Sequence, residues 1–200
     1  MHKFNNFDLH IALKILIIDN YDSFTFNLAH YIEGVTGEDV EVIRNDLVKL
    51  NELSKYDKIV ISPGPGLPKQ SGLLMEALVN IPYNTPVLAI CLGMQAYAEL
   101  GGIPLFNLEN TCHGISVDCK LDTGFVLFKG LPDSTEVGLY HSWAVRNDLT
   151  EQWKATAISS SGILMGMSHV RKPIHCVQFH PESVLTPEGK NMVMNFINRT

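Results

Sequence analysis

Cys91 stands between a short apolar run and a segment rich in helix formers, a setting that suits a nucleophilic thiol. Residues 87–91 predict a strand buried on both faces. A strand-to-helix turn of this kind exposes its side chain at the carboxyl edge of a sheet. The following helix directs free N–H groups at the sulfur, which favours the thiolate, and places the N–H of Leu92 to receive an oxyanion. Gly93 lets a substrate or a neighbouring backbone approach closely. The alternative interpretation of Cys91 is a buried structural cysteine.

His180 and Glu182 are further candidate catalytic residues, because they follow directly on a predicted buried strand at residues 174–179. Residues two apart in an extended segment share a face, and Pro181 between them stiffens the pair. A carboxylate beside an imidazole raises its basicity and fixes its tautomer, as a general base for a thiol requires. The other seven histidines are interpreted as structural: His2, His10, His30, His113, His141, His169 and His175.

Two further segments place polar or flexible residues at predicted strand ends. Residues 63–66 read Pro-Gly-Pro-Gly and lie at the same carboxyl edge as Cys91. Their N–H groups suit a second oxyanion donor or a clamp on a polar substrate, although a tight surface turn is the alternative. Residues 140–143 read Tyr-His-Ser-Trp and close another predicted strand, where they either hold a substrate backbone or turn a hairpin.

Strands and helices alternate over the first hundred residues. Strands are expected at residues 15–18, 40–43, 58–62 and 87–91, and helical segments at 22–33, 48–53, 73–79 and 92–100. This alternation predicts an α/β fold with an open, mostly parallel central sheet and helices on both faces. Asp22 or Ser23 is expected to cap the first helix, and Gly34 and Gly37 to end it.

The pattern changes after Gly102, where short alternating segments predict a smaller antiparallel sheet. Its strands are expected at residues 114–119, 125–128, 137–140, 153–158 and 163–168. Thr186 is expected to cap a last helix with Pro187 at its first position. Because no repeat or linker divides the chain, residues 1–200 are predicted as a single domain, with residues 1–13 as a poorly specified lead-in.

Composition excludes several classes of partner. A net charge of −6 without a basic run argues against nucleic acid or a membrane surface as a partner, and no apolar run is long enough to span a bilayer. The four cysteines show no zinc-site spacing, and the first residues lack the apolar core of a secretory signal. We therefore expect a soluble cytoplasmic protein with reduced thiols.

Five segments resemble the class I (triad) glutamine amidotransferases, and more narrowly the small glutaminase subunits of anthranilate synthase and aminodeoxychorismate synthase. The segments are residues 18–25, 62–66, 91–95, 140–142 and 178–183. The resemblance covers nearly the whole chain from Ile15 onward and implies the flavodoxin-like α/β fold of this family. It also implies that Cys91 attacks the side-chain amide of glutamine to form a γ-glutamyl thioester, with His180 as base and Glu182 orienting it.

The same resemblance implies further contacts. The oxyanion and glutamine site is expected to comprise Gly64, Pro65, Gly66, Leu92, Gln95, Ser142 and Trp143. No cofactor and no metal are implied. The implied partner is a chorismate-binding large subunit, either anthranilate synthase component I or aminodeoxychorismate synthase, which receives the ammonia. Its expected contacts are Tyr21, Asp22, Ser23, Phe24 and Thr25.

The chain departs from the family pattern at Met94, Leu139 and Ile115, which weakens the choice between the two pathways. Anthranilate is the preferred product, and aminodeoxychorismate is the alternative. A stand-alone γ-glutamyl hydrolase with the same triad stays open. So does a non-catalytic regulatory subunit, although the intact Cys91, His180 and Glu182 argue against it.

Overall fold

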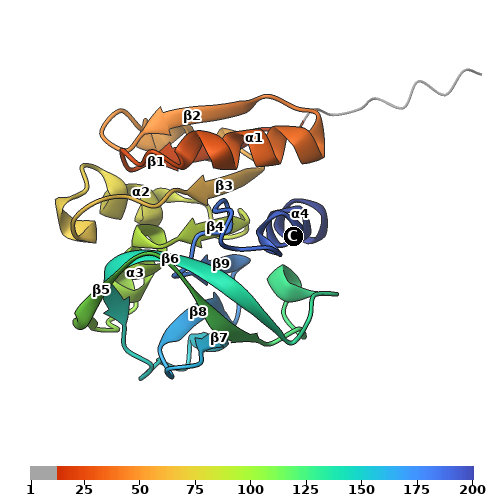
Figure 1. Ribbon diagram of the computed structural model, residues 1–200. Coiled ribbons are helices and arrows are strands. Elements are labelled where there is room, and N and C mark those ends of the chain that lie inside the picture. Colours follow the sequence, from red (N-terminus) through yellow and green to blue (C-terminus); the bar gives the residue numbers. More distant parts are fainter. Residues whose placement is uncertain (1–12) are drawn as a thin grey trace, which may run out of the picture.

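A computed structural model describes residues 13–200 and places one mixed sheet at the centre of the molecule (Figure 1). The strands are β1 (Ile15–Asp19), β2 (Val40–Arg44), β3 (Lys58–Ile61), β4 (Val87–Ile90), β5 (Leu105–Leu121), β6 (Ser134–Val145), β7 (Trp153–Ser159), β8 (Leu164–His169) and β9 (Ile174–Val177). The α-helices are α1 (Thr25–Thr36), α2 (Leu74–Asn80), α3 (Leu92–Leu100) and α4 (Gly189–Arg199), and the 3-10 helices are η1 (Leu50–Lys55), η2 (Pro68–Gln70) and η3 (Val126–Phe128). The predicted lead-in, apart from Leu13, lies outside the described residues.

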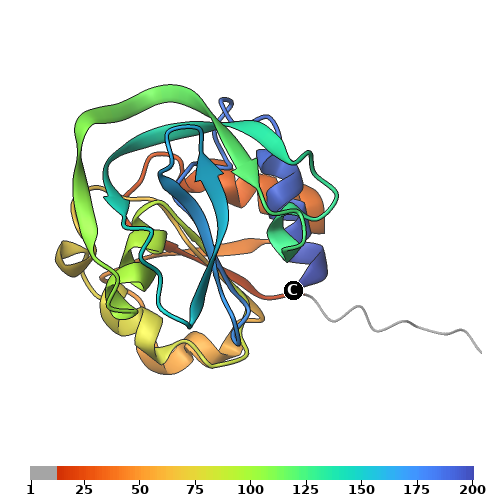
Figure 2. The same cartoon turned by 90° about the horizontal axis from the view of Figure 1, so that it is seen from below.

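Within residues 13–200 the nine strands follow the order β2-β1-β3-β4-β9-β8-β7-β5-β6. The first five are parallel to one another, and the remaining four continue the sheet with antiparallel pairings. Figures 1 and 2 show the antiparallel part curling away from the parallel strands. In the strand order, β5 and β6 stand at the end opposite to β2. The predicted α/β class is confirmed. A separate smaller sheet was the wrong expectation, because β8 pairs with the open edge of β9 and joins the two parts.

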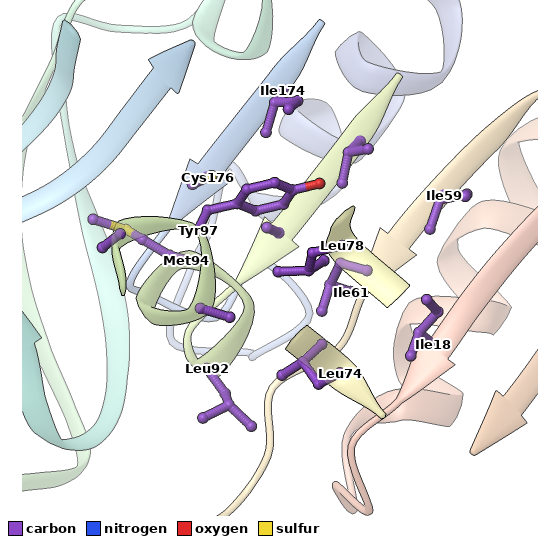
Figure 3. Close-up of a cluster of buried hydrophobic side chains, with 14 of the residues drawn as sticks. Ile18, Ile59, Ile61, Leu74, Leu78, Leu92, Met94, Tyr97, Ile174 and Cys176 are labelled. Atoms are coloured by element: carbon purple, nitrogen blue, oxygen red, sulfur yellow. The ribbon is translucent and has the colours of Figure 1, made fainter. Parts of the chain in front are cut away.

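The parallel strands are buried on both faces, as their apolar sequences predict. In β1, Ile15 and Ile17 face one apolar cluster with α1 and α4, whereas Leu16 and Ile18 face another with α2 and α3. Figure 3 shows part of the second cluster, in which Tyr97 of α3 lies over the sheet. Burying each such isoleucine or leucine stabilises the fold by roughly 1.5–3 kcal/mol. Alternation along a strand therefore explains the helices on both faces.

Helix α1 begins and ends later than predicted. Its N-cap is Phe24, and neither predicted cap acts as one, because the Asp22 carboxylate instead accepts from the Phe24 N–H at 2.8 Å. Gly34 lies inside the helix, and Gly37 ends it in a left-handed conformation. The prediction for Gly37 is confirmed, and that for Gly34 is wrong because a single helical glycine is tolerated.

Two predictions in the second half of the chain are also wrong. Residues 125–128 contain the 3-10 helix η3 and no strand, because Leu127 and Phe128 turn inward to pack in the core. Helix α4 begins at Gly189, so that Thr186 and Pro187 precede it. The Thr186 hydroxyl is used elsewhere, in a buried bridge between β6 and the segment after β9.

None of the helices in the described part of the chain combines the length and apolarity needed to cross a bilayer.

Candidate active site

Cys91 occupies a strained turn between β4 and α3. Its backbone has φ 51° and ψ −101°, and among the described residues it and Tyr21 are the two non-glycine residues with positive φ. Such a conformation costs about 1–3 kcal/mol and persists where the surroundings hold it. Here the Cys91 N–H donates to Val177 O at 2.7 Å. The cysteine therefore lies directly before the first turn of α3, at the predicted strand-to-helix junction.

Gly93 is required by the packing of α3 on the sheet. A Cβ at this position would lie 2.9 Å from Ile61 Cγ2 and 3.2 Å from Ala89 Cβ. A close approach was predicted, but the groups that approach are side chains of β3 and β4 rather than a substrate or a backbone. The glycine thus sets how closely the start of α3, and with it Cys91, lies on the sheet.

His180 and Glu182 are held together just beyond the end of β9. The Nδ1 atom of His180 lies 2.6 Å from Glu182 Oε1, and both residues are 2% exposed. The His180 N–H donates to Gly138 O on β6 at 3.1 Å, and its carbonyl accepts from the Thr186 hydroxyl at 2.7 Å. These bonds restrain the backbone on both sides of the imidazole. The predicted pairing of His180 with Glu182 is present, but the predicted extended segment is wrong, because a turn closed by the Ser183 N–H on His180 O at 3.2 Å brings the two side chains together.

The strand order brings this pair to Cys91. Strands β4 and β9 are parallel neighbours in which Ile90 pairs with Val177, so both chains leave the sheet at the same edge. Burial lowers the pKa of His180, but the interaction with Cys91 and the hydrogen bond and charge of Glu182 outweigh it and raise the pKa above its usual value. Because Nδ1 is bonded to Glu182, Nε2 is the ring nitrogen left for the thiol, and no atom of the described residues lies in hydrogen-bond geometry with it.

Gln178 is a site residue that the sequence analysis did not single out. It is fully buried, and its Nε2 donates to Cys91 Sγ at 3.4 Å. Its Oε1 accepts from Gln95 Nε2 at 3.2 Å, and the same Gln95 nitrogen donates to Trp143 O at 2.9 Å. A signal was available: Gln178 lies two residues before His180 at a strand end, so both side chains leave on one face.

His141 also lies at the site, although the sequence analysis interpreted it as structural. Its Nδ1 is 2.9 Å from Trp143 O, and since a carbonyl can only accept, Nδ1 carries the proton. Burial lowers the pKa of His141 to about 4; the Trp143 carbonyl opposes this shift and the nearby His180 adds to it. His141 is therefore neutral at neutral pH.

The Pro-Gly-Pro-Gly loop lies against the start of α3. A Cβ at Gly64 would lie 2.5 Å from Asn20 Cβ and 2.9 Å from Leu92 Cδ2, so that only glycine fits there. Asn20 fixes the strand end before the loop, because it donates to Ser62 from its backbone N–H and from Nδ2, at 2.8 Å in each case. The loop thus adjoins Leu92, the residue predicted to share the oxyanion site. Pro65 and Gly66 are exposed.

The segment predicted to contact a partner is partly exposed. Tyr21 and Ser23 are exposed, Asp22 and Phe24 are half-buried, and Thr25 is fully buried with its hydroxyl on Asp19 Oδ1. Burial leaves Thr25 no surface to offer, so its role is to fix the start of α1.

Aromatic rings connect this segment to the imidazole. The centroid of the Phe24 ring lies 5.2 Å from that of Tyr140 and 5.9 Å from that of His180. Tyr140 packs edge-on against His180 at 4.9 Å, and its hydroxyl lies 3.0 Å from Ser183 Oγ. Residues 140–143 were predicted to close a strand. This prediction is wrong, because they lie inside β6.

Ser142 and Trp143 are half-buried on β6 beside Gln95. The ladder between β5 and β6 is interrupted here: Trp143 pairs with Asn107 and His141 with Cys112, so that Ser142 has no partner in the described register. The register shift at this point marks an irregularity of the sheet beside Gln95.

The three departures from the family pattern lie in different surroundings. Met94 and Leu139 are buried in the two apolar clusters, and Ile115 is 45% exposed on β5. Only Ile115 is thus placed where it can alter a surface. Within residues 13–200, no three His, Cys, Asp or Glu side chains come together as metal ligands would.

Residues 16–200 match the family model described as glutamine amidotransferase class-I. Anthranilate synthase component II from Haloarcula marismortui is 42% identical over 187 residues, which cover 91% of this chain and 96% of that protein. The aminodeoxychorismate/anthranilate synthase component 2 of Bacillus subtilis is 39% identical, with 92% and 95% of the two chains covered.

Among solved structures, a protein from Thermoplasma acidophilum that is named for GMP synthase has a TM-score of 0.84 at 26% identity, and 94% of each chain is covered. The matched region spans all of the site segments from β1 to the segment after β9. The family prediction and the prediction of an enzyme are confirmed: the chain belongs to the class I glutamine amidotransferases.

Proposed function

We propose that this protein hydrolyses glutamine to glutamate and ammonia and delivers the ammonia to a chorismate-binding large subunit. The observation that carries the proposal is the convergence of Cys91, His180 and Glu182 at one sheet edge, with a 2.6 Å contact between the imidazole and the carboxylate. A thiol, a basic imidazole and an orienting acid are the groups that covalent acyl transfer requires.

In the first half of the reaction the Cys91 thiolate attacks the side-chain carbonyl carbon of glutamine. The developing oxyanion is placed to accept from the Leu92 N–H, which as the first helical N–H has no intrahelical acceptor, and from the adjoining Gly64 or Gly66. His180, held protonated by Glu182, gives its proton to the leaving nitrogen. The C–N bond breaks, ammonia leaves, and a γ-glutamyl thioester stays on Cys91.

In the second half a water molecule attacks the thioester carbonyl. His180 accepts a proton from the water, the C–S bond breaks, and glutamate leaves as the thiolate and imidazolium are restored. Ser142, Trp143 and Gln95 lie beside this centre and supply polar groups for the α-amino and α-carboxylate groups of glutamine. No cofactor enters either half.

The acceptor of the ammonia is proposed from the relatives, whose names are those of anthranilate and aminodeoxychorismate synthase components. We favour anthranilate as the product of the complex. The aminodeoxychorismate route is a second candidate, because the Bacillus subtilis relative is named for both activities. The exposed Tyr21 and Ser23 and the half-buried Asp22 and Phe24 are the proposed contacts to the large subunit.

Glutamate release from glutamine tests the proposal, measured for the protein alone and with a chorismate-binding large subunit plus chorismate. We expect a low basal rate that rises when the partner is added, and the aromatic product names the pathway. Cys91→Ser should lower the rate by at least about 10³-fold, because the nucleophile is lost while the fold is kept. A Cys91→Ser variant that retains activity would remove the nucleophile assignment, and a high rate without any partner effect would favour a stand-alone hydrolase.

A further inference from the structure

Gln178 is the described side chain that donates a hydrogen bond to the sulfur of Cys91. Its side chain is completely buried, and its backbone N–H donates to Met165 O on β8 at 2.9 Å. The residue is therefore anchored in the sheet while its amide reaches the strand-to-helix turn. We infer that Gln178 is a positioning residue that holds the Cys91 sulfur as a hydrogen-bond acceptor, and thereby favours the thiolate needed for attack.

The direction of this hydrogen bond is imposed by a chain of groups that begins at Trp143. The Trp143 carbonyl can only accept, so Gln95 must present its NH₂ group to it. The second hydrogen of that NH₂ group points to Gln178, which must therefore present its oxygen. The NH₂ group of Gln178 is then left for the sulfur of Cys91.

Burial keeps the amides of Gln95 and Gln178 in this orientation. Gln95 and Gln178 are 3% and 0% exposed, so neither amide can rotate without leaving polar atoms unpaired. His141 donates to the same Trp143 carbonyl, which keeps that oxygen engaged from two sides. An acceptor with a negative charge gains most from a donor fixed in this way, because charge-assisted hydrogen bonds are the stronger ones.

His180 and Gln178 thus have separate tasks at the sulfur. The imidazole exchanges protons with the reacting groups, and no atom of the described residues lies in hydrogen-bond geometry with its Nε2. The amide of Gln178 has no proton to give up at neutral pH and stays a donor throughout. The inference rests on the proposed role of Cys91 as nucleophile, but it concerns the state of the thiol before any substrate binds.

Gln178→Met tests the inference, because it keeps the length of the side chain and removes the donor. The readout is the rate of Cys91 alkylation by iodoacetamide against pH, with modification of Cys91 identified by peptide mass spectrometry. We expect the midpoint of the profile to rise by about one pH unit, which corresponds to about tenfold less thiolate below the midpoint. The kcat for glutamine should fall by a similar factor while KM changes by less than about twofold, because Gln178 acts on the sulfur rather than on substrate.

Gln178→Glu is the companion variant, since it still offers an oxygen to Gln95 but replaces the donor with a group that opposes negative charge. We expect a larger upward shift of the midpoint than with methionine. Gln152→Met, an exposed residue before β7, is the matched control and should leave both the profile and the kinetics unchanged.

A profile that does not move in either Gln178 variant, at an unchanged melting temperature, would overturn the inference. If the methionine variant does not fold, the glutamate variant decides. In the unaltered protein, the side-chain amide resonance of Gln178 should also shift when Cys91 ionises, and a resonance that ignores the thiol would equally overturn it. Alkylation needs no glutamine turnover, so a shifted profile in a protein without glutaminase activity would refute the proposed function and leave this inference standing.

Discussion

The parallel strands and the antiparallel strands contribute different kinds of group to the site. The ends of β4 and β9 deliver Cys91 and, just beyond, the pair of His180 and Glu182, whose side chains carry the proposed chemistry. Strand β6 contributes groups that orient the others, namely the Trp143 carbonyl and the Gly138 carbonyl.

This difference follows from the two kinds of pairing. Parallel strands all end at one edge, so that residues just after β3, β4 and β9 meet there whatever their separation in the chain. Residues of an antiparallel strand instead run past the site, and β6 reaches it in mid-strand through the carbonyls of Gly138 and Trp143. The proposed reacting groups therefore come from strand ends, where Gln178 and Glu182 also lie, whereas β6 contributes backbone carbonyls from the middle of a strand.

Removing the charge of Glu182 tests the contribution of the strand ends, and it has the largest expected effect after loss of Cys91 itself. In Glu182→Gln the contact to Nδ1 can be kept while the charge that favours the imidazolium is lost. We expect glutaminase activity to fall on the order of 10²- to 10⁴-fold. Because burial already disfavours the charged ring, His180 should also release its proton at a lower pH than in the unaltered protein, which an NMR titration of the ring would measure. An unchanged titration would show that Glu182 does not support the base.

The Thr186 hydroxyl connects β6 to the segment after β9, and Thr186→Val removes its two hydrogen bonds while keeping the shape of the side chain. The hydroxyl accepts from the Gly138 N–H at 2.9 Å and donates to His180 O at 2.7 Å, and both partners are buried. The Gly138 N–H would lose its acceptor, while His180 O would keep only the bond from the Ser183 N–H, so the free energy of unfolding should fall by about 1–3 kcal/mol. Urea unfolding measures the change, and activity should fall with it because the backbone of His180 loosens.

Thr150→Val is the control, since Thr150 is exposed before β7. It should change the stability by less than about 0.5 kcal/mol. Equal effects of the two substitutions would show that the hydrogen bonds of Thr186 add nothing to the free energy of unfolding.

Two glycine-to-alanine substitutions are expected to have smaller effects, which differ in sign. Gly93→Ala adds a methyl group 2.9 Å from Ile61 at the start of α3, and should lower the free energy of unfolding by about 1–3 kcal/mol and disturb Cys91. Gly34→Ala adds the same group inside α1, where nothing lies within 4 Å, and should raise the stability by about 0.5–1 kcal/mol. Thermal melts of the two variants measure both signs. A neutral Gly93→Ala would mean that the contact between α3 and the sheet is loose.

Much of this arrangement could be predicted from local pattern. Apolar runs that end in Cys91 or just before His180 indicate buried strands with polar residues at their ends, since a parallel strand needs apolar side chains on both faces. The spacing of His180 and Glu182 likewise predicts a shared face. The sequence thus determined the α/β class, the family and the candidate triad.

The tertiary structure decided what depends on separation in the chain. The hydrogen bond from Gln178 to Cys91 joins residues 87 positions apart in the sequence, and that from Gln95 to Gln178 joins residues 83 positions apart. No local sequence pattern predicts such hydrogen bonds. The same holds for Thr186, whose type suits a helix cap but whose hydroxyl is needed by β6. The union of the two predicted sheets into one was also beyond local pattern, because β8 joins β9 through backbone groups that every residue type except proline possesses.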